Sequence, residues 1–300
     1  MFDLLSAFWL HLGLAMMVGP LAFFLVLERI MPAEQGHGVK DVWVNLKLGL
    51  AYRFGTFVYV GLTAAFTAWL MHYVPNGLVD LRFVTHGYFA LDLLAALLWF
   101  LVYDFFYYWF HRAQHEWKWL WSQHRVHHST PTLNVAAASA HHWLEDALRV
   151  PAITVPFGVL FTLNPFAAGV VLILANAWGY FIHANLRLSL GRMSAVFCGP
   201  QVHRVHHSRE AHHFDKNYAA FFPVWDVVFG TYYHPAKNEF PPTGVPDYPM
   251  PVRTWNIFMD PFLAWGKGLR QRWARDAIGV GRQRPADGPA ISTDPFRNNA

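Results

Sequence analysis

The chain has 300 residues, of which 54% are hydrophobic and only 14% are charged, and its formal net charge is +4. A soluble domain of this size usually carries about a quarter of charged residues, so the composition argues against an ordinary soluble domain. The single cysteine, Cys198, excludes a disulfide framework and any zinc or iron–sulfur site made of cysteines.

Four long apolar stretches follow one another in the first two thirds of the chain: Leu4–Leu27, Phe54–Val74, Tyr88–Phe110 and Val150–Ala184. A membrane-spanning helix needs ~20 apolar residues, so the first three stretches predict single spans. The first lacks a basic start and is interpreted as an anchor, not a signal peptide. The fourth predicts a hairpin that turns near Asn164-Pro165. The expected fold is an all-α, integral-membrane helical bundle of about four to five membrane segments.

The positions of lysine and arginine predict the orientation of this bundle. If Met1 lies outside, only Arg82 of the 23 basic residues falls in an outer segment. Cytoplasmic loops carry an excess of Lys and Arg, so the later part of the chain is expected to form a cytoplasmic helical cap. We therefore expect the protein to lie in the inner membrane of a bacterium, or in the ER membrane if the source is a eukaryote. Contact with anionic lipids explains the positive charge better than binding of nucleic acid.

Eight of the 18 histidines lie in three short motifs: His111-x-x-x-His115, His124-x-x-His127-His128 and His203-x-x-His206-His207. Helix positions i, i+3 and i+4 share a face, so we expect each motif to aim its imidazoles at one point. Such crowding is costly without a cation, and eight ligands exceed the three or four that one zinc ion takes. The motifs therefore predict two metal ions. Imidazole binds Zn, Cu, Fe and Ni, so ligand type leaves the metal open.

The end of the chain changes character after the histidine motifs. Residues 230–250 are rich in proline and turn residues, and 255–273 have the apolar periodicity of an amphipathic helix. This helix either lies in the cytoplasmic membrane interface or packs on the core. We expect four regions in all: transmembrane anchors over 1–87, a histidine-motif domain over 88–240, an interfacial segment over 241–278 and a disordered tail over 279–300.

Four segments between about Tyr103 and Tyr233 together closely resemble the fatty acid hydroxylase/sterol desaturase superfamily. They are YYWFHRAQHEWKWLWSQHRVHHS (Tyr107–Ser129), FIHANLRLSLG (Phe181–Gly191), QVHRVHHSRE (Gln201–Glu210) and DKNYAAFFPVWDVVFGTYY (Asp215–Tyr233). The resemblance implies an integral-membrane enzyme that binds two iron ions and uses O2 to hydroxylate or desaturate a lipid C–H bond. It also implies that His183 is a ninth ligand, although a histidine at a helix end can simply face lipid headgroups.

Four polar residues, Asp104, Asn134, Asp215 and Asn217, are expected to support the metal ligands. Asp104 precedes His111 by two helical turns, so it can accept an N–H bond from a ligand or pair with Arg112 instead. Asp215 and Asn217 match polar positions of the family, with a simple turn as the alternative, and Asn134 is similar. Weaker candidates are His142 and Glu145, which match a His-x-x-Glu feature, Glu116, and His212 and His213 as auxiliary ligands.

The chain contains no glycine-rich dinucleotide motif and no heme or iron–sulfur module, so electrons must come from an external ferredoxin, cytochrome or reductase. Five basic residues could dock an acidic donor or contact lipid phosphates: Arg112, Lys118, Arg125, Arg204 and Arg209. The main alternative function is a membrane zinc-dependent lipid hydrolase. A metal transporter or sensor is disfavoured because the motifs follow the spans. The sequence does not choose among sterol, fatty acyl, alkylglycerol and carotenoid substrates, and hydroxylation is preferred over desaturation.

Overall fold

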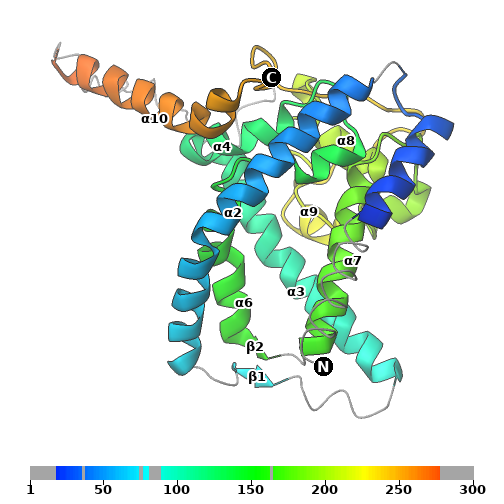
Figure 1. The fold of residues 1–300 in the computed structure, drawn as a ribbon. Coiled ribbons are helices and arrows are strands. Elements are labelled where there is room, and N and C mark those ends of the chain that lie inside the picture. Colours follow the sequence, from blue (N-terminus) through cyan, green and yellow to red (C-terminus); the bar gives the residue numbers. More distant parts are fainter. Residues whose placement is uncertain (1–17, 36–37, 74–76, 81–88, 163–164, 278–300) are drawn as a thin grey trace, which may run out of the picture. The chain divides into compact units, whose positions relative to one another are not determined.

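The structure is a computed structural model that describes residues 18–35, 38–73, 77–80, 89–162 and 165–277 (Figure 1). Several predictions fall outside these residues: the first part of the N-terminal anchor, the loop with Arg82, the turn at Asn164 and the tail from residue 279. The chain forms two compact units, Met1–Asp260 and Pro261–Ala300. The described part is mostly helical, which confirms the predicted all-α class.

Three long helices run through the first unit: α2 (Val39–Tyr73), α3 (Phe89–Glu116) and α7 (Pro165–His183). They extend from the end of the unit that holds α4 and α8 to the end where strands β1 (Val79–Asp80) and β2 (Phe161–Thr162) lie (Figure 1). The two strands pair in parallel, with Val79 opposite Phe161. The long helices therefore lead from this strand pair toward the short elements that carry most of the histidine motifs.

Helix α2 begins fifteen residues before the predicted span at Phe54. Its first half packs on the segment Val135–Ser139, so tertiary contacts extend the helix beyond its apolar run. Leu48 is fully buried there in a cluster with Val126 and Ala140. Gly49 allows the close approach, because a Cβ at this position would lie 3.0 Å from the Cβ of Ser139.

One segment of the described residues, Leu94–Glu116 in α3, is long and apolar enough to cross a membrane by length and composition. The second half of α2 exposes large apolar side chains such as Phe57 (76%) and Leu62 (75%), and surfaces of this kind mark interaction with membranes or proteins. The number of membrane segments and the cytoplasmic position of the cap remain predictions.

The fourth apolar stretch does not form two simple helical arms. Its first arm is short and is broken by a π-helical turn that contains Pro151. Because proline lacks the N–H of the regular helix ladder, the wider turn accommodates it. The second arm is α7, which ends on His183. The elements of the first arm are α5 (Glu145–Arg149), η3 (Val150–Thr154) and α6 (Val155–Leu160).

Residues 18–30 form a further helix, and short elements carry most of the rest of the described chain. They are α4 (Lys118–His128), η2 (Val135–Ser139), η4 (Gly191–Ala195), α8 (Pro200–His206), η5 (Ala211–His213) and α9 (Val224–Val228). The predicted amphipathic helix is present within α10 (Thr254–Ala277), which contains Pro261. Its location at a membrane interface stays a prediction.

Candidate metal centre

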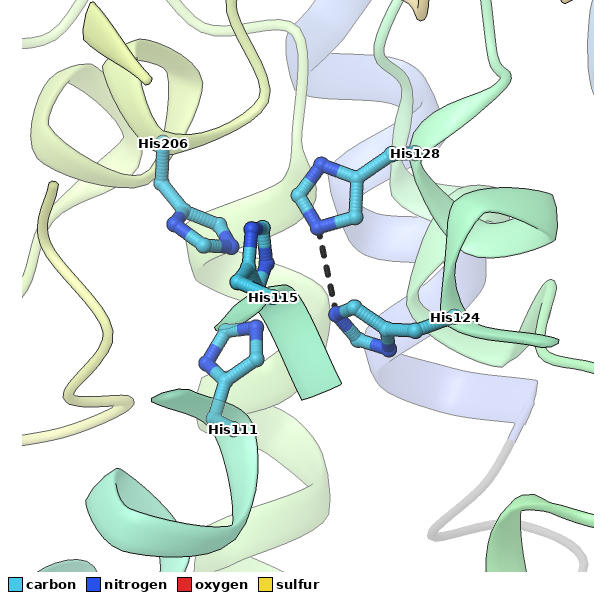
Figure 2. Close-up of side chains that lie close together, drawn as sticks. All are labelled: His111, His115, His124, His128 and His206. Atoms are coloured by element: carbon cyan, nitrogen blue, oxygen red, sulfur yellow. Dashed lines mark hydrogen bonds between the residues drawn. The ribbon is translucent and has the colours of Figure 1, made fainter. Parts of the chain in front are cut away.

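The nine histidines singled out by the sequence come together in two groups, although they lie on four different helices. The five-histidine group consists of His111, His115, His124, His128 and His206 (Figure 2). The four-histidine group consists of His127, His183, His203 and His207. Within each group the candidate ligand atoms lie within 4.8 Å of one another. All nine side chains except that of the half-buried His115 are buried.

The motifs divide between the groups in a crossed pattern. On α4, His124 and His128 belong to the five-histidine group and His127 to the other. At α8, His203 and His207 belong to the four-histidine group, while His206 points into the five-histidine group. The expectation that each motif aims at one point is therefore wrong for the second and third motifs, and it holds for His111 and His115, which share the five-histidine group. Each of the two identical His-Arg-Val-His-His segments contributes to both groups, so neither group forms without both segments.

The spacing of the ring nitrogens fits ligands that share an ion. The Nε2 atoms of His124 and His128 lie 3.2 Å apart. In the other group the Nε2 atom of His183 lies 3.1 Å from that of His127 and 3.0 Å from that of His203. Two nitrogens bound at ~2.1 Å to one ion, at ~90–109° to each other, are separated by ~3.0–3.4 Å. The observed separations agree with this range.

Main-chain carbonyls fix the orientation of three of these imidazoles. The Nδ1 atom of His111 donates to the carbonyl of Tyr218 at 2.6 Å. Likewise His206 donates to Lys216 at 2.8 Å, and His183 donates to the carbonyl of Gly179 one helical turn earlier at 2.7 Å. A neutral imidazole with its proton on Nδ1 keeps a free lone pair on Nε2, the form that binds metals.

Several ring nitrogens are buried without a hydrogen-bond partner among the described residues, including Nε2 of His111, His115 and His206. A buried polar atom left unpaired costs about 1–3 kcal/mol, so a cluster of them is unstable unless a cation binds. These three atoms belong to the five-histidine group, whose rings converge in Figure 2. The donor set therefore fits a metal ion.

The electrostatic environment keeps five of these imidazoles neutral. Burial lowers the pKa of His206 to about 3. Burial and the neighbouring imidazoles also hold the pKa values of His127, His128, His203 and His207 well below their usual range. Neutral imidazole is the ligand form, so these side chains are ready to bind a metal at pH 7.

A cavity of about 330 Å³ reaches the five-histidine group. Its lining includes His115, His128 and His206 together with Trp121, Asp215 and Val245. The cavity gives a small molecule, or part of a larger one, a path to three of the five imidazoles.

Asp104 does not have the expected role. Its carboxylate accepts the backbone N–H groups of Ala220, Phe221 and Phe222 at 3.0, 3.2 and 2.7 Å. The prediction that Asp104 pairs with a ligating histidine or with Arg112 is therefore wrong. Arg112 instead pairs with Glu116, at 2.7 Å. The loop after α8 passes beside α3 and occupies the carboxylate, so Asp104 anchors this loop.

Replacing Asp104 by alanine is expected to destabilise the protein by about 3 kcal/mol or more, because three amides that are buried or partly buried lose their acceptor. The free energy of unfolding of the purified protein in detergent measures the effect. Glu116→Ala is the control. It removes a carboxylate that is 47% exposed, and loss of its pair with Arg112 is expected to cost less than about 1 kcal/mol. An equal, small effect in both variants would contradict the anchoring role.

Asp215 and Asn217 form a turn, which was the alternative considered for them. Both residues have a left-handed φ of 59°, a conformation that Asn and Asp tolerate better than most residues. The Asn217 side chain accepts the N–H of Tyr233 at 2.8 Å and donates to its carbonyl at 3.1 Å. The carbonyls of Lys216 and Tyr218 in this turn accept from His206 and His111, and the Asp215 side chain accepts from the Tyr218 hydroxyl at 3.2 Å.

The remaining polar candidates lie outside both groups. Asn134 caps η2 by accepting the N–H of Ala136 at 3.2 Å. His142 lies 3.2 Å from the carbonyl of Phe258. His212 is 61% exposed, and the buried His213 contacts Ser208 and Glu239. With Glu210 they form a separate set of possible metal ligands apart from both groups, so an auxiliary ligand role for this pair stays a prediction.

Arg204 cannot dock an electron donor, because its side chain is only 2% exposed. It donates to the carbonyl of Pro241 and to Asn185, and it pairs with Glu34. The prediction of a docking surface that includes this residue is therefore wrong.

His141 was not among the predicted site residues. Its ring stacks on that of His127, with centroids 4.0 Å apart and planes 10° apart. Its Nδ1 lies 4.0 Å from Glu145, and together with His124 these residues form a third buried set of possible ligands. His141 precedes α5 outside any helix, so the helical spacing rule that picked out the three motifs does not apply to it.

Residues 96–231 match the family model of fatty acid hydroxylases. Alkylglycerol monooxygenase of Homo sapiens is 34% identical over 47% of this chain and 30% of that protein. The enzyme of the same name from Danio rerio is also 34% identical, over 60% of this chain and 38% of its own length. Ornithine lipid hydroxylase OlsE of Rhizobium tropici is 27% identical over 45% of this chain and 40% of its own.

The chain thus spans about a third of the length of the curated relatives it matches. No solved structure shows significant similarity to it. The family match covers α3, α4, α7 and α8 from residue 96 onward and includes all nine histidines of the two groups. The resemblance to the fatty acid hydroxylase superfamily is therefore confirmed over residues 96–231.

Proposed function

We propose that this protein is a membrane-bound oxygenase with two non-heme iron ions, which hydroxylates a lipid with O2 and electrons from an external donor. The observation that carries this proposal is the division of nine histidines into groups of five and four, with nitrogen spacings that suit one ion each. Hydroxylation is preferred over desaturation because the relatives named above are monooxygenases and a hydroxylase.

In this proposal the five-histidine group holds one iron and the four-histidine group holds the other. Bound iron would supply the reduction of O2 and the oxidation of a C–H bond. The protein supplies neutral ligands, and the carbonyls of Tyr218, Lys216 and Gly179 fix the tautomers of three of them. Burial of eight of the nine side chains limits their contact with bulk water, and the cavity at His115, His128 and His206 is the route by which small molecules reach the five-histidine group.

A lipid substrate is supported by the names of the relatives and by an apolar cavity in the protein. The names of the relatives describe enzymes of alkylglycerols and of an ornithine lipid, which are both lipids. An almost wholly apolar cavity of about 490 Å³ lies between α3, α7 and the loop at Phe221 and Phe222. Trp178 and Phe181, which line it, precede the ligand His183 on α7. A hydrocarbon chain suits such a lining.

The membrane location rests on α3. Its candidate span, Leu94–Glu116, contains His111 and His115 at one end, so the two groups would lie near a membrane surface. The distribution of Lys and Arg makes that surface the cytoplasmic one. A donor of electrons would then reach the cap from the cytoplasm, and a lipid would reach it from the bilayer.

Metal analysis and an oxygen-labelling assay test this proposal. Full-length protein expressed with ample iron is expected to contain about two irons per chain. With a chemical reductant, 18O2 and an alkylglycerol or an ornithine lipid, one 18O atom should appear in the product. Stoichiometric zinc without iron, together with lipid cleavage that needs no O2, would replace this proposal with the zinc hydrolase. Comparing the lipids of cells that lack the protein with those of complemented cells would identify the natural substrate.

A further inference from the structure

A buried carboxylate, Glu145, lies beside the histidine groups without belonging to either. Its side chain is 2% exposed. Oε2 accepts a hydrogen bond from Nε2 of Gln114 at 2.8 Å and lies 3.7 Å from Nδ1 of His124. Oε1 lies 3.3 Å from Arg149 and 4.0 Å from Nδ1 of His141. Each oxygen thus faces one fixed donor and one imidazole.

The orientation of His124 explains what this carboxylate can do. Nε2 of His124 points into the five-histidine group, 3.2 Å from Nε2 of His128. Its Nδ1 is buried, has no hydrogen-bond partner among the described residues and faces Glu145. Two other ligands of this group, His111 and His206, donate Nδ1–H to main-chain carbonyls. Glu145 occupies the corresponding position beside His124.

The separation of 3.7 Å is that of an electrostatic contact and is longer than a direct hydrogen bond. Because His124 and Glu145 are at most 2% exposed, water screens this contact little. The pair of donors from Gln114 and Arg149 keeps the carboxylate in place. Arg149 also brings a positive charge, which argues against a third metal ion at His124, His141 and Glu145.

We propose that Glu145 is a positioning residue that holds the proton of His124 on Nδ1 and directs its Nε2 lone pair at the ion of the five-histidine group. A carboxylate attracts this proton more strongly than a carbonyl does, which makes the imidazole a stronger ligand. The role rests on the metal centre proposed above. It predicts that loss of Glu145 weakens binding of the ion in the five-histidine group and has little effect on binding of the ion in the four-histidine group.

Titration of metal-free, full-length protein with Co²⁺ in detergent tests this role, since the visible absorption of Co²⁺ reports its coordination. The wild type should bind two ions. His206→Ala and His203→Ala assign the two binding events, because each variant removes a ligand of one group. Glu145→Gln is expected to lower the affinity of the five-histidine group for Co²⁺ by 10–100-fold, the usual cost of losing a residue that orients a ligand. The affinity of the four-histidine group for Co²⁺ should change by less than about 3-fold.

Asp146→Asn is the matched control. Asp146 is the next residue of α5 and lies 3.9 Å from the same Arg149, but it accepts hydrogen bonds from Tyr52 and Thr56 on α2. Its loss removes the same charge without touching His124, so both affinities should stay within about 3-fold of the wild type.

The outcomes separate the two proposals. A wild type that binds fewer than two Co²⁺ ions contradicts the metal centre itself. If Glu145→Gln binds two Co²⁺ ions with unchanged affinities, only the role of Glu145 is overturned. The same follows if the affinities of both groups fall equally. The same holds if Asp146→Asn matches Glu145→Gln. If Glu145→Gln does not fold, Gln114→Leu, which removes one donor that fixes the carboxylate, should lower the affinity of the five-histidine group for Co²⁺ by about 3-fold or more. An unchanged affinity there also overturns the role.

Discussion

The variant His206→Ala is expected to lose the ion of the five-histidine group and to retain less than about 1% of the wild-type hydroxylation rate. Removing a residue that only orients a ligand already costs 10–100-fold in metal affinity or activity, and removing the ligand itself costs more. His203→Ala should lose the other ion with a similar loss of rate. Iron per chain and the rate of product formation measure both effects.

The crossed pattern of the motifs makes this prediction specific. His206 and His128 belong to one group although they come from different motifs, and His207 and His127 are assigned to the other. Alanine variants at His206 and His128 should therefore lose the same ion. If variants at His203 and His206, which come from one motif, lose the same ion, the grouping is wrong. His212→Ala is the control: this side chain is 61% exposed and lies outside both groups, so iron and turnover should be unchanged.

The sequence was sufficient to find the candidate ligands but not to sort them into the two groups. Spacings of three and four residues place His124, His127 and His128 on one side of α4, as the helical periodicity predicts. Which of them shares an ion with His206 depends on how α4 and α8 are placed, and no local pattern encodes that placement. His183 came from the family resemblance alone, because a single histidine at the end of α7 has no spacing signal of its own.

The residues that support the ligands were harder to predict, for two physical reasons. Asp104 and His111 lie on one helix, α3, as predicted. The carboxylate nevertheless binds amides of residues 220–222, which lie more than a hundred positions away in the sequence. The groups that orient His111 and His206 are main-chain carbonyls, which no side-chain pattern reveals. Arg204 was misjudged for a related reason, since its partner Glu34 lies far away in the sequence.

The second large effect concerns pH. The metal-free protein is expected to lose stability steeply as the pH falls from 8 to 5. Burial lowers the pKa of His206 to about 3, and it holds those of His127, His128, His203 and His207 well below their usual range. In the unfolded chain a histidine titrates near ~6.5. Between these values the unfolded state binds more protons than the folded state, so acid favours unfolding.

The sign and size follow from this difference. Stability is fully present above the unfolded pKa and is lost as the pH falls toward the folded pKa. His206 alone should cost ~2 kcal/mol at pH 5 relative to pH 8, and the four other histidines act in the same direction. The sum is a large part of the 5–15 kcal/mol that stabilises a typical domain. Bound metal must be displaced before these imidazoles protonate, so the loaded protein should resist acid to a lower pH.

Guanidinium unfolding at pH 8, 7, 6 and 5, with and without metal, measures this effect. His206→Asn should reduce the difference in stability between pH 8 and 5 by ~2 kcal/mol in the metal-free protein, because it removes one of the titrating groups. His212→Asn, at an exposed position outside both groups, should leave that difference unchanged. A metal-free protein equally stable at pH 8 and pH 5 would mean that these imidazoles take up protons without unfolding. Dry burial, on which the proposed metal centre depends, would then be wrong.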